Sequence, residues 1–75
     1  MCDPVHDPLF LSGPVSDIAR QADVDYATAR QCYMAGMEVY EATVWLRWGQ
    51  RHGKSVDQIL EIWRRRRARG RRALP

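Results

Sequence analysis

The sequence predicts a small all-α fold: a bundle of four short helices, preceded by a proline-rich N-terminal arm and followed by a basic C-terminal extension. The chain has 75 residues, of which 45% are hydrophobic, and this is enough for one small core. Hydrophobic residues recur at spacings of three and four, and no segment alternates as a strand does. Three of the four prolines lie close to the N-terminus. We therefore expect an irregular arm over residues 1–14, a helical domain over 15–63 and an arginine-rich tail over 64–75.

The first helix is predicted over residues 16–22, with Ser16 as its N-cap because serine favours that position. Four small or hydrophobic residues recur there at helical spacing: Val15, Ile18, Ala19 and Ala22. Residues 23–25 are typical of a turn. The helix is therefore expected to be short and to lead directly into the next one.

Asp25 is expected to cap the second helix, which begins at Tyr26, and Gly36 is expected to end it. Ala29, Cys32 and Tyr33 fall on one face of this helix. That face is predicted to lie against the core.

The third helix is predicted over about residues 37–50, and two hydrophobic stripes run along it. One stripe consists of Met37, Tyr40, Val44 and Trp48, and the other of Val39, Ala42 and Leu46. A helix with two such stripes is expected to be central and contacted from two sides. Gly49 and Gly53 predict that it frays or ends between them.

The fourth helix is predicted to begin after Ser55, its N-cap. Val56, Ile59, Leu60 and Trp63 then follow a helical hydrophobic pattern. Beyond Trp63 every face of the helix is basic, and we expect it to continue to about Ala68.

The predicted core is the set of hydrophobic residues on the inner faces of these four helices. Its members are Ile18, Ala22, Val24, Ala29, Cys32, Tyr33, Tyr40, Val44, Trp45, Leu46, Trp48, Val56, Ile59, Leu60 and Trp63. The small size of the chain and its three tryptophans leave a homodimer open, since a second copy would bury surface that one copy cannot.

Charge is unevenly distributed along the chain. Residues 1–63 carry five basic side chains against nine acids, a net charge of −4, whereas residues 64–75 carry seven arginines and no acid. Clustered arginines bind polyanions through bidentate phosphate contacts and counterion release. The tail therefore predicts a nucleic acid as partner, with an anionic membrane, an acidic protein surface or a solvated tail as alternatives. The predicted phosphate-binding residues are Arg64, Arg65, Arg66, Arg67, Arg69, Arg71 and Arg72.

Spacing in the first two predicted helices points to a known arrangement. Ala19 is a small residue where the helices would cross, Val24 is hydrophobic and follows the turn, and Ala29 and Cys32 would seat the second helix. With Ile18, these residues resemble the pattern of the helix-turn-helix family of DNA-binding domains. The chain departs from that family at Asp23, where glycine usually adopts a left-handed conformation, although Asp tolerates this region better than most residues.

The resemblance implies that the helix of residues 26–34 is a recognition helix in the DNA major groove. The residues that would face the groove are Tyr26, Ala27, Thr28, Arg30 and Gln31. In this interpretation Arg30 reads guanine and Gln31 reads adenine. The resemblance favours DNA over RNA, while an αα-hairpin inside an ordinary helical bundle is the plain structural alternative.

A second resemblance covers residues 29–63. The segments that carry it are Met34-Ala35-Gly36-Met37, Glu41-Ala42, Gly53-Lys54-Ser55-Val56 and Ile59-Leu60. They are similar to a ubiquitin-associated three-helix domain. In that family the loop that contains Met34, Gly36 and Met37 forms a protein-binding surface, so the alternative function is that of a protein-interaction adaptor.

Calcium binding is a minor alternative that rests on Asp23 and Asp25. These two residues resemble the start of an EF-hand loop, which also needs an oxygen ligand, a glycine and a glutamate at its fifth, sixth and twelfth positions. The chain has Ala27, Thr28 and Met34 there. We therefore expect no metal site, and we expect no cofactor because no phosphate-binding glycine loop is present.

Enzymatic activity is not expected, since no nucleophile has a recognisable base and orienting group. The hydrophobic runs are far shorter than the roughly 18 residues of a membrane span. Cys2 and Cys32 fit no disulfide framework, and the acidic N-terminus resembles no export signal. We therefore expect a cytoplasmic, non-enzymatic, nucleic-acid-binding protein, in the role of a transcriptional regulator, with a protein partner as the alternative.

Overall fold

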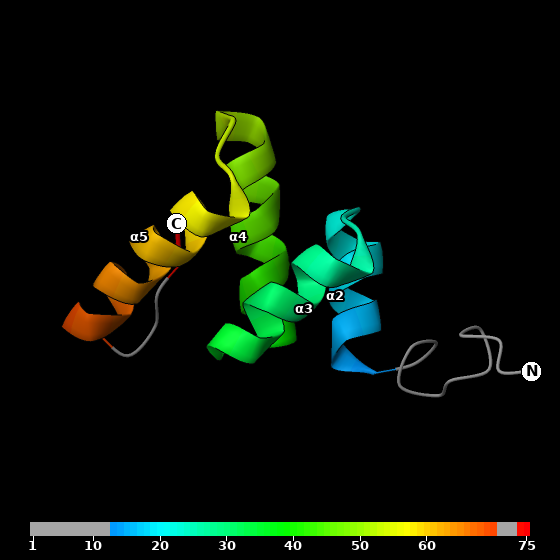
Figure 1. Ribbon diagram of the computed structural model, residues 1–75. Helices are drawn as coiled ribbons and strands as arrows, with labels where there is room; N and C mark the ends of the chain where they lie inside the picture. The colour runs from blue at the N-terminus through cyan, green and yellow to red at the C-terminus, as the bar shows by residue number, and fades with distance from the viewer. Residues whose placement is uncertain (1–12, 71–73) are drawn as a thin grey trace, which may run out of the picture.

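A computed structural model describes residues 13–70 and 74–75 and confirms the predicted fold class. Four helices make up this part of the chain: α2 (Pro14–Ala22), α3 (Tyr26–Ala35), α4 (Val39–His52) and α5 (Val56–Arg69) (Figure 1). No strand occurs among the described residues. The predicted arm therefore lies almost wholly outside them, as do Arg71 and Arg72 of the tail.

Helix α4 stands at the centre of the bundle. It contacts α2, α3 and α5, whereas α2 and α5 do not contact each other (Figure 1). The prediction that this helix is reached from more than one side is confirmed. Helices α3 and α5 also pack against each other, so α3 lies between the two outer helices.

The core is formed mainly by one stripe from each helix. The buried hydrophobic residues are Val15, Ile18, Ala22, Ala29, Cys32, Met37, Ala42, Trp45, Leu46, Ile59, Leu60 and Trp63. Nine of the fifteen predicted core residues are in this set. Val24, Val44, Trp48 and Val56 are half-buried.

Two predicted core residues are exposed, Tyr33 at 39% and Tyr40 at 66%. Tyr40 is predicted to be buried together with the rest of its stripe on α4, but this stripe is only partly covered. Four of the five buried residues of α4, at positions 42, 45, 46 and 49, follow the spacing of a single helical face, which leaves Val44 and Trp48 half-buried and Tyr40 exposed. The buried residues of α3 are Ala29 and Cys32, both small, and the ring of Tyr33 lies to the side of that narrow face.

Two helix starts differ from the prediction. Helix α2 begins at Pro14 with Gly13 as its N-cap, so Ser16 is a buried residue inside the helix. Proline suits the first turn because its missing N–H has no partner there anyway. Helix α4 begins at Val39 and not at the predicted residue 37. Glu38 is its N-cap residue and forms a capping box with Glu41 in the first turn.

The helix ends follow the predicted glycines and the predicted serine cap. Gly36 ends α3 and Gly53 ends α4, both with positive φ (114° and 64°). The hydroxyl of Ser55 accepts a hydrogen bond from the N–H of Gln58, and the Gln58 side chain accepts one from the N–H of Ser55. This capping box fixes the start of α5, which then continues through its arginines to Arg69.

Candidate nucleic-acid interface

The turn between α2 and α3 has the backbone geometry that the sequence suggested. Asp23 is left-handed, with φ 57° and ψ 52°, and the N–H of Val24 donates to the carbonyl of Ala19 at 3.0 Å. Asp23 is the one non-glycine residue with positive φ in the described part of the chain. Because Ala29 and Cys32 are fully buried, the opposite face of α3 is turned toward solvent.

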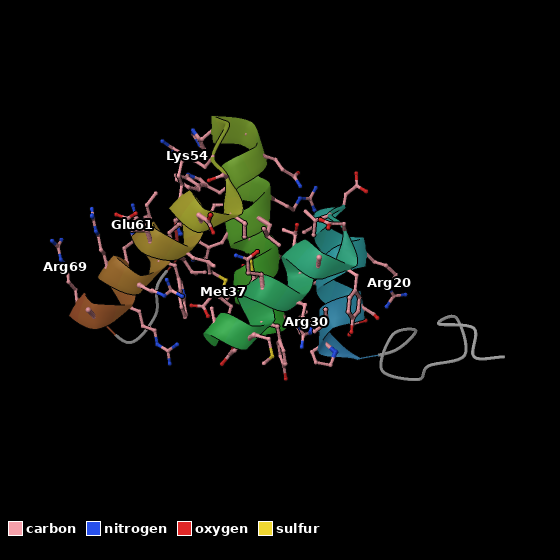
Figure 2. The ribbon with its side chains drawn as sticks, viewed as in Figure 1. Arg20, Arg30, Met37, Lys54, Glu61 and Arg69 are labelled. Carbon is pink, nitrogen blue, oxygen red and sulfur yellow. The ribbon has the colours of Figure 1, made fainter. Side chains whose placement is uncertain are left out.

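On that face, Arg30 is a predicted contact residue that is both exposed and charged. It is exposed, and no hydrogen bond or ion pair joins it to another residue among those described. Figure 2 shows it projecting from α3 away from the core. Its guanidinium group is therefore available to a ligand.

Of the other four predicted contact residues of α3, Ala27 is exposed, and the remaining three have partners or burial of their own. Tyr26 is half-buried and packs against the core. The hydroxyl of Thr28 donates to the carboxylate of Asp25. Asp25 is the N-cap residue of α3, as predicted, but its side chain forms no hydrogen bond to the helix backbone. Nε2 of Gln31 donates to Oδ1 of Asp57 on α5 at 3.2 Å, so this amide joins two helices.

The described arginines of the tail lie on different faces of α5. Arg66 and Arg67 lie over tryptophan rings, at 5.5 Å from the centroid of Trp45 and 5.1 Å from that of Trp63. Arg65 forms an ion pair with Glu61 at 2.7 Å. Arg69 is exposed at the end of the helix, and Arg64 lines a groove against α3.

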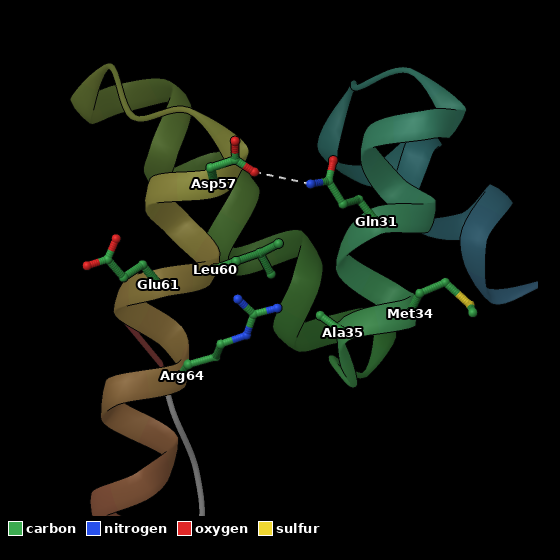
Figure 3. A pocket seen from close by; sticks show the side chains of 7 residues that line it. All are labelled: Gln31, Met34, Ala35, Asp57, Leu60, Glu61 and Arg64. Carbon is green, nitrogen blue, oxygen red and sulfur yellow. Dashed lines mark hydrogen bonds between the residues drawn. The ribbon is translucent and has the colours of Figure 1, made fainter.

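This groove lies between α3 and the middle of α5 and has a volume of about 510 Å³. Its lining residues are Gln31, Met34, Ala35, Asp57, Leu60, Glu61 and Arg64 (Figure 3). Arg64 reaches across it from α5 toward α3, on the far side from the Gln31–Asp57 hydrogen bond. The groove therefore has an acidic end, a basic end and an apolar floor.

The two predicted sets of contact residues meet only in part: Gln31 of α3 and Arg64 of α5 line the same groove, whereas Arg30 and Arg69 do not lie together. Figure 2 shows Arg30 and Arg69 projecting from separate parts of the molecule, one from α3 and the other from the far end of α5. A ligand that touches both must be extended, as a nucleic acid duplex is. A small anion could reach one of the two sites at most.

Glu41 is a residue that sequence reasoning missed. Its Oε2 accepts a hydrogen bond from the indole N–H of Trp63 at 2.9 Å, and its Oε1 accepts from the N–H of Glu38. One carboxylate thus joins the start of α4 to the buried tryptophan of α5. The capping-box spacing of Glu38 and Glu41 was the available sequence signal for its first role, whereas nothing local indicates the second.

The alternatives to nucleic-acid binding can be compared with the same geometry. No group of three His, Cys, Asp or Glu residues suited to a metal occurs within 13–70 and 74–75, and Thr28 already donates to Asp25 of the calcium-like motif. Met37 is only 1% exposed, whereas Met34 is 68% exposed. A protein-binding loop of the ubiquitin-associated kind would therefore present Met34 but not Met37.

No helix in the described part of the chain is long and apolar enough to cross a membrane. The chain matches no model of a known protein family, and no curated protein or solved structure is significantly similar to it.

Proposed function

We propose that this protein is a small, non-enzymatic nucleic-acid-binding protein that regulates transcription by binding duplex DNA. In this proposal the outward face of α3, with Arg30, lies in the major groove, and arginines of α5 contact the phosphate backbone. Phosphate contacts supply most of the affinity, and contacts to base edges supply the preference for a sequence.

The observation that carries the proposal is the end of α5. Its last six residues include five arginines and no acid, and all six are exposed. Such a density of guanidinium groups on one helical segment repels itself in isolation and gains energy when a polyanion neutralises it.

The α2–α3 pair supports a duplex as the polyanion. Its left-handed turn and buried inner face leave α3 with an exposed surface, and a single helix of this kind fits the width of the major groove of B-DNA. Arg30 has the planar, bidentate group that best recognises guanine.

The first test is a titration of the full chain against labelled random-sequence duplex DNA, single-stranded DNA and RNA of equal length at several salt concentrations. We expect the tightest binding to the duplex, with a log–log salt slope of about −0.9 for each phosphate contacted. Failure to bind any of the three at low salt would overturn the proposal, and a preference for RNA would replace its ligand.

The second test addresses α3. Duplexes selected from a random library should show a preferred sequence, and Arg30→Ala should weaken binding to that sequence by about 1–3 kcal/mol relative to random DNA. Arg47→Ala is the matched control, because Arg47 is an exposed arginine of α4 outside both predicted sets. Equal effects of the two variants on the preferred sequence would remove the role of α3.

A protein-interaction adaptor is the second candidate, and one observation favours it. Tyr33, Met34 and Tyr40 are the large hydrophobic residues exposed in the described part of the chain, and all three flank the α3–α4 turn. Met34 also lines the groove between α3 and α5. In this case Met34→Glu should abolish a stoichiometric protein complex that persists after nuclease treatment, while Arg30→Ala should leave it intact.

A further inference from the structure

The face of α5 that packs against the bundle is hydrophobic in the first half of the helix and carries arginines in the second half. Ile59, Leu60 and Trp63 are buried against the bundle, each at 4% exposure or less. The next positions on the same face, three and four residues after Trp63, are Arg66 and Arg67. These two arginines therefore point toward the body of the protein instead of away from it.

Both inner arginines have specific contacts there. The guanidinium group of Arg66 lies over the ring of Trp45, and its Nη1 donates to the carbonyl of Leu74 at 2.8 Å. The two contacts are separate: the Cζ atom lies 5.5 Å from the centroid of the Trp45 ring, and the hydrogen bond is donated by Nη1. Arg66 thus joins α5 to α4 and to the chain end that follows it.

Arg67 lies against the turn between α3 and α4. It stacks over Trp63, and a Cβ atom placed on Gly36 would come within 3.0 Å of its Nη1. The guanidinium group is therefore beside the C-terminal end of α3, where the helix dipole favours a cation.

The opposite face of α5 carries a different pair. Arg65 and Arg69 are four residues apart, so they lie one above the other on the outside of the helix. The side chain of Arg65 is 74% exposed despite its ion pair with Glu61, and Arg69 has no partner among the residues described. An exposed ion pair of this kind is weak, so Arg65 can exchange its carboxylate for a phosphate.

We infer that the arginine run has two functions divided by helical periodicity. Arg65 and Arg69 form the face that contacts phosphate, whereas Arg66 and Arg67 are positioning residues that hold the end of α5 on Trp45 and Trp63. Glu61 competes with phosphate for Arg65 and lowers the affinity. This inference rests on the proposed function, because the ligand of the outer face is the nucleic acid backbone.

The test compares two variants that remove the same charge from the same helix. Arg65→Ala/Arg69→Ala should make the salt slope for random duplex DNA shallower by about 1.8, since two phosphate contacts are lost, and should leave the unfolding midpoint unchanged. Arg66→Ala/Arg67→Ala should leave the slope close to that of the parent but lower the Tm by about 4–8 °C and shift the tryptophan emission.

A conservative variant separates loss of stacking from loss of charge. Arg66→Lys/Arg67→Lys keeps both charges but lacks the planar group that stacks on indole. We expect the parent salt slope together with a lowered Tm. This variant also covers the case in which the alanine pair fails to fold.

Glu61→Gln provides an independent test, because it should raise the affinity for duplex DNA about two- to fivefold by freeing Arg65. Asp17→Asn is the matched control: it breaks an exposed Asp17–Arg20 ion pair on α2 and should change the affinity less.

Equal slope changes for the outer and inner alanine pairs would overturn the division of the arginines while leaving DNA binding intact. Absence of DNA binding by the parent would overturn the outer face together with the proposed function, and an unchanged Tm for both inner variants would overturn the positioning role.

Discussion

The two halves of α5 use the same helical face in different ways. In residues 56–63 that face carries Ile59, Leu60 and Trp63, which are removed from water. In residues 64–69 every residue is exposed, and the same face carries Arg66 and Arg67 over the rings of two tryptophans. A helix can therefore remain attached beyond its hydrophobic stripe when aromatic rings lie under its cations.

The first half is held at several points along its length. The Ser55–Gln58 capping box fixes its start, Ile59 packs tightly against Gly49 of α4, and the indole of Trp63 donates to Glu41. The second half is held by the cation–π contacts of Arg66 and Arg67, which are individually weak at exposed sites, and by the hydrogen bond from Arg66 to Leu74. The end of α5 can therefore loosen or adapt to a ligand while its beginning stays fixed.

Trp63→Ala should cause the largest loss of stability, because Trp63 contacts residues that hold both halves of α5 in place. The substitution removes a buried aromatic side chain, leaves the Glu41 oxygen without its indole partner and takes away the ring under Arg67. We expect a loss of about 3–5 kcal/mol of stability, measured by urea unfolding. Trp48→Ala is the control, since Trp48 is only half-buried; an equal loss there would contradict the central position given to Trp63.

Gly49→Ala, a substitution on α4, should disturb only the packing of the first half of α5. A Cβ at Gly49 would lie 2.2 Å from Cδ1 and 2.9 Å from Cγ1 of the buried Ile59. We expect overpacking to cost about 1–3 kcal/mol. Because a 2.2 Å approach is a severe overlap, the cost should lie in the upper part of that range and exceed the gain of about 1 kcal/mol in helix propensity. Chemical denaturation measures it, and Ile59→Val in the same chain should recover part of the loss because it removes the Cδ1 atom.

Gly70, the C-cap of α5, offers a matching glycine-to-alanine substitution beside the second half of the helix. Nothing lies within 4 Å of a Cβ placed there, and its φ of −159° suits any residue. Gly70→Ala should therefore be nearly neutral. A loss as large as that of Gly49→Ala would mean that the end of α5 is packed as closely as its beginning.

Ser55→Ala should cost about 1 kcal/mol, because it removes the acceptor for the N–H of Gln58. The effect should appear in the thermal unfolding midpoint and leave the cation–π contacts of Arg66 and Arg67 intact. Ser55→Asp should retain most of the stability, since Asp is also a good N-cap. If the aspartate variant is as unstable as the alanine variant, the cap is not the cause.

Alkaline pH should destabilise the folded chain through the buried thiol of Cys32. Burial raises the pKa of the Cys32 thiol from its ordinary value of 9.0 to about 11, so the folded state favours the neutral thiol. This contribution to stability is fully present below pH 9 and is lost as the pH rises from about 9 to about 11. Unfolding measured across this range should therefore show a steeper fall in stability for the parent chain than for Cys32→Ala, and equal slopes would contradict the assignment.

Most of the secondary structure could be predicted from local signals. The cap at Ser55, the glycines at positions 36 and 53 and the hydrophobic spacing of α5 each lie within a few residues of the feature they determine. The start of α4 was misjudged because Met37, although buried, precedes the helix. Burial and helicity usually coincide, but here a hydrophobic residue of the turn fills the core.

How deeply each stripe of α4 is buried required the packed structure. Both stripes satisfy helical spacing, and the depth to which each is buried depends on the surfaces that α2, α3 and α5 offer to it. Trp45 and Leu46 belong to the buried side, and Tyr40 is consequently exposed. Spacing within a helix carries no information about the position of its neighbours.

The sequence by itself determined the fold class, the concentration of positive charge at the end of the chain and the residue types that could bind phosphate. Only the tertiary structure decided which arginines are free, because Trp45 and Gly36 are brought to Arg66 and Arg67 from distant positions in the chain. It likewise tied Gln31 to Asp57 and left Arg30 exposed. The physical reason is that charge and helical periodicity are local properties, whereas the partner of a side chain is set by how the helices pack.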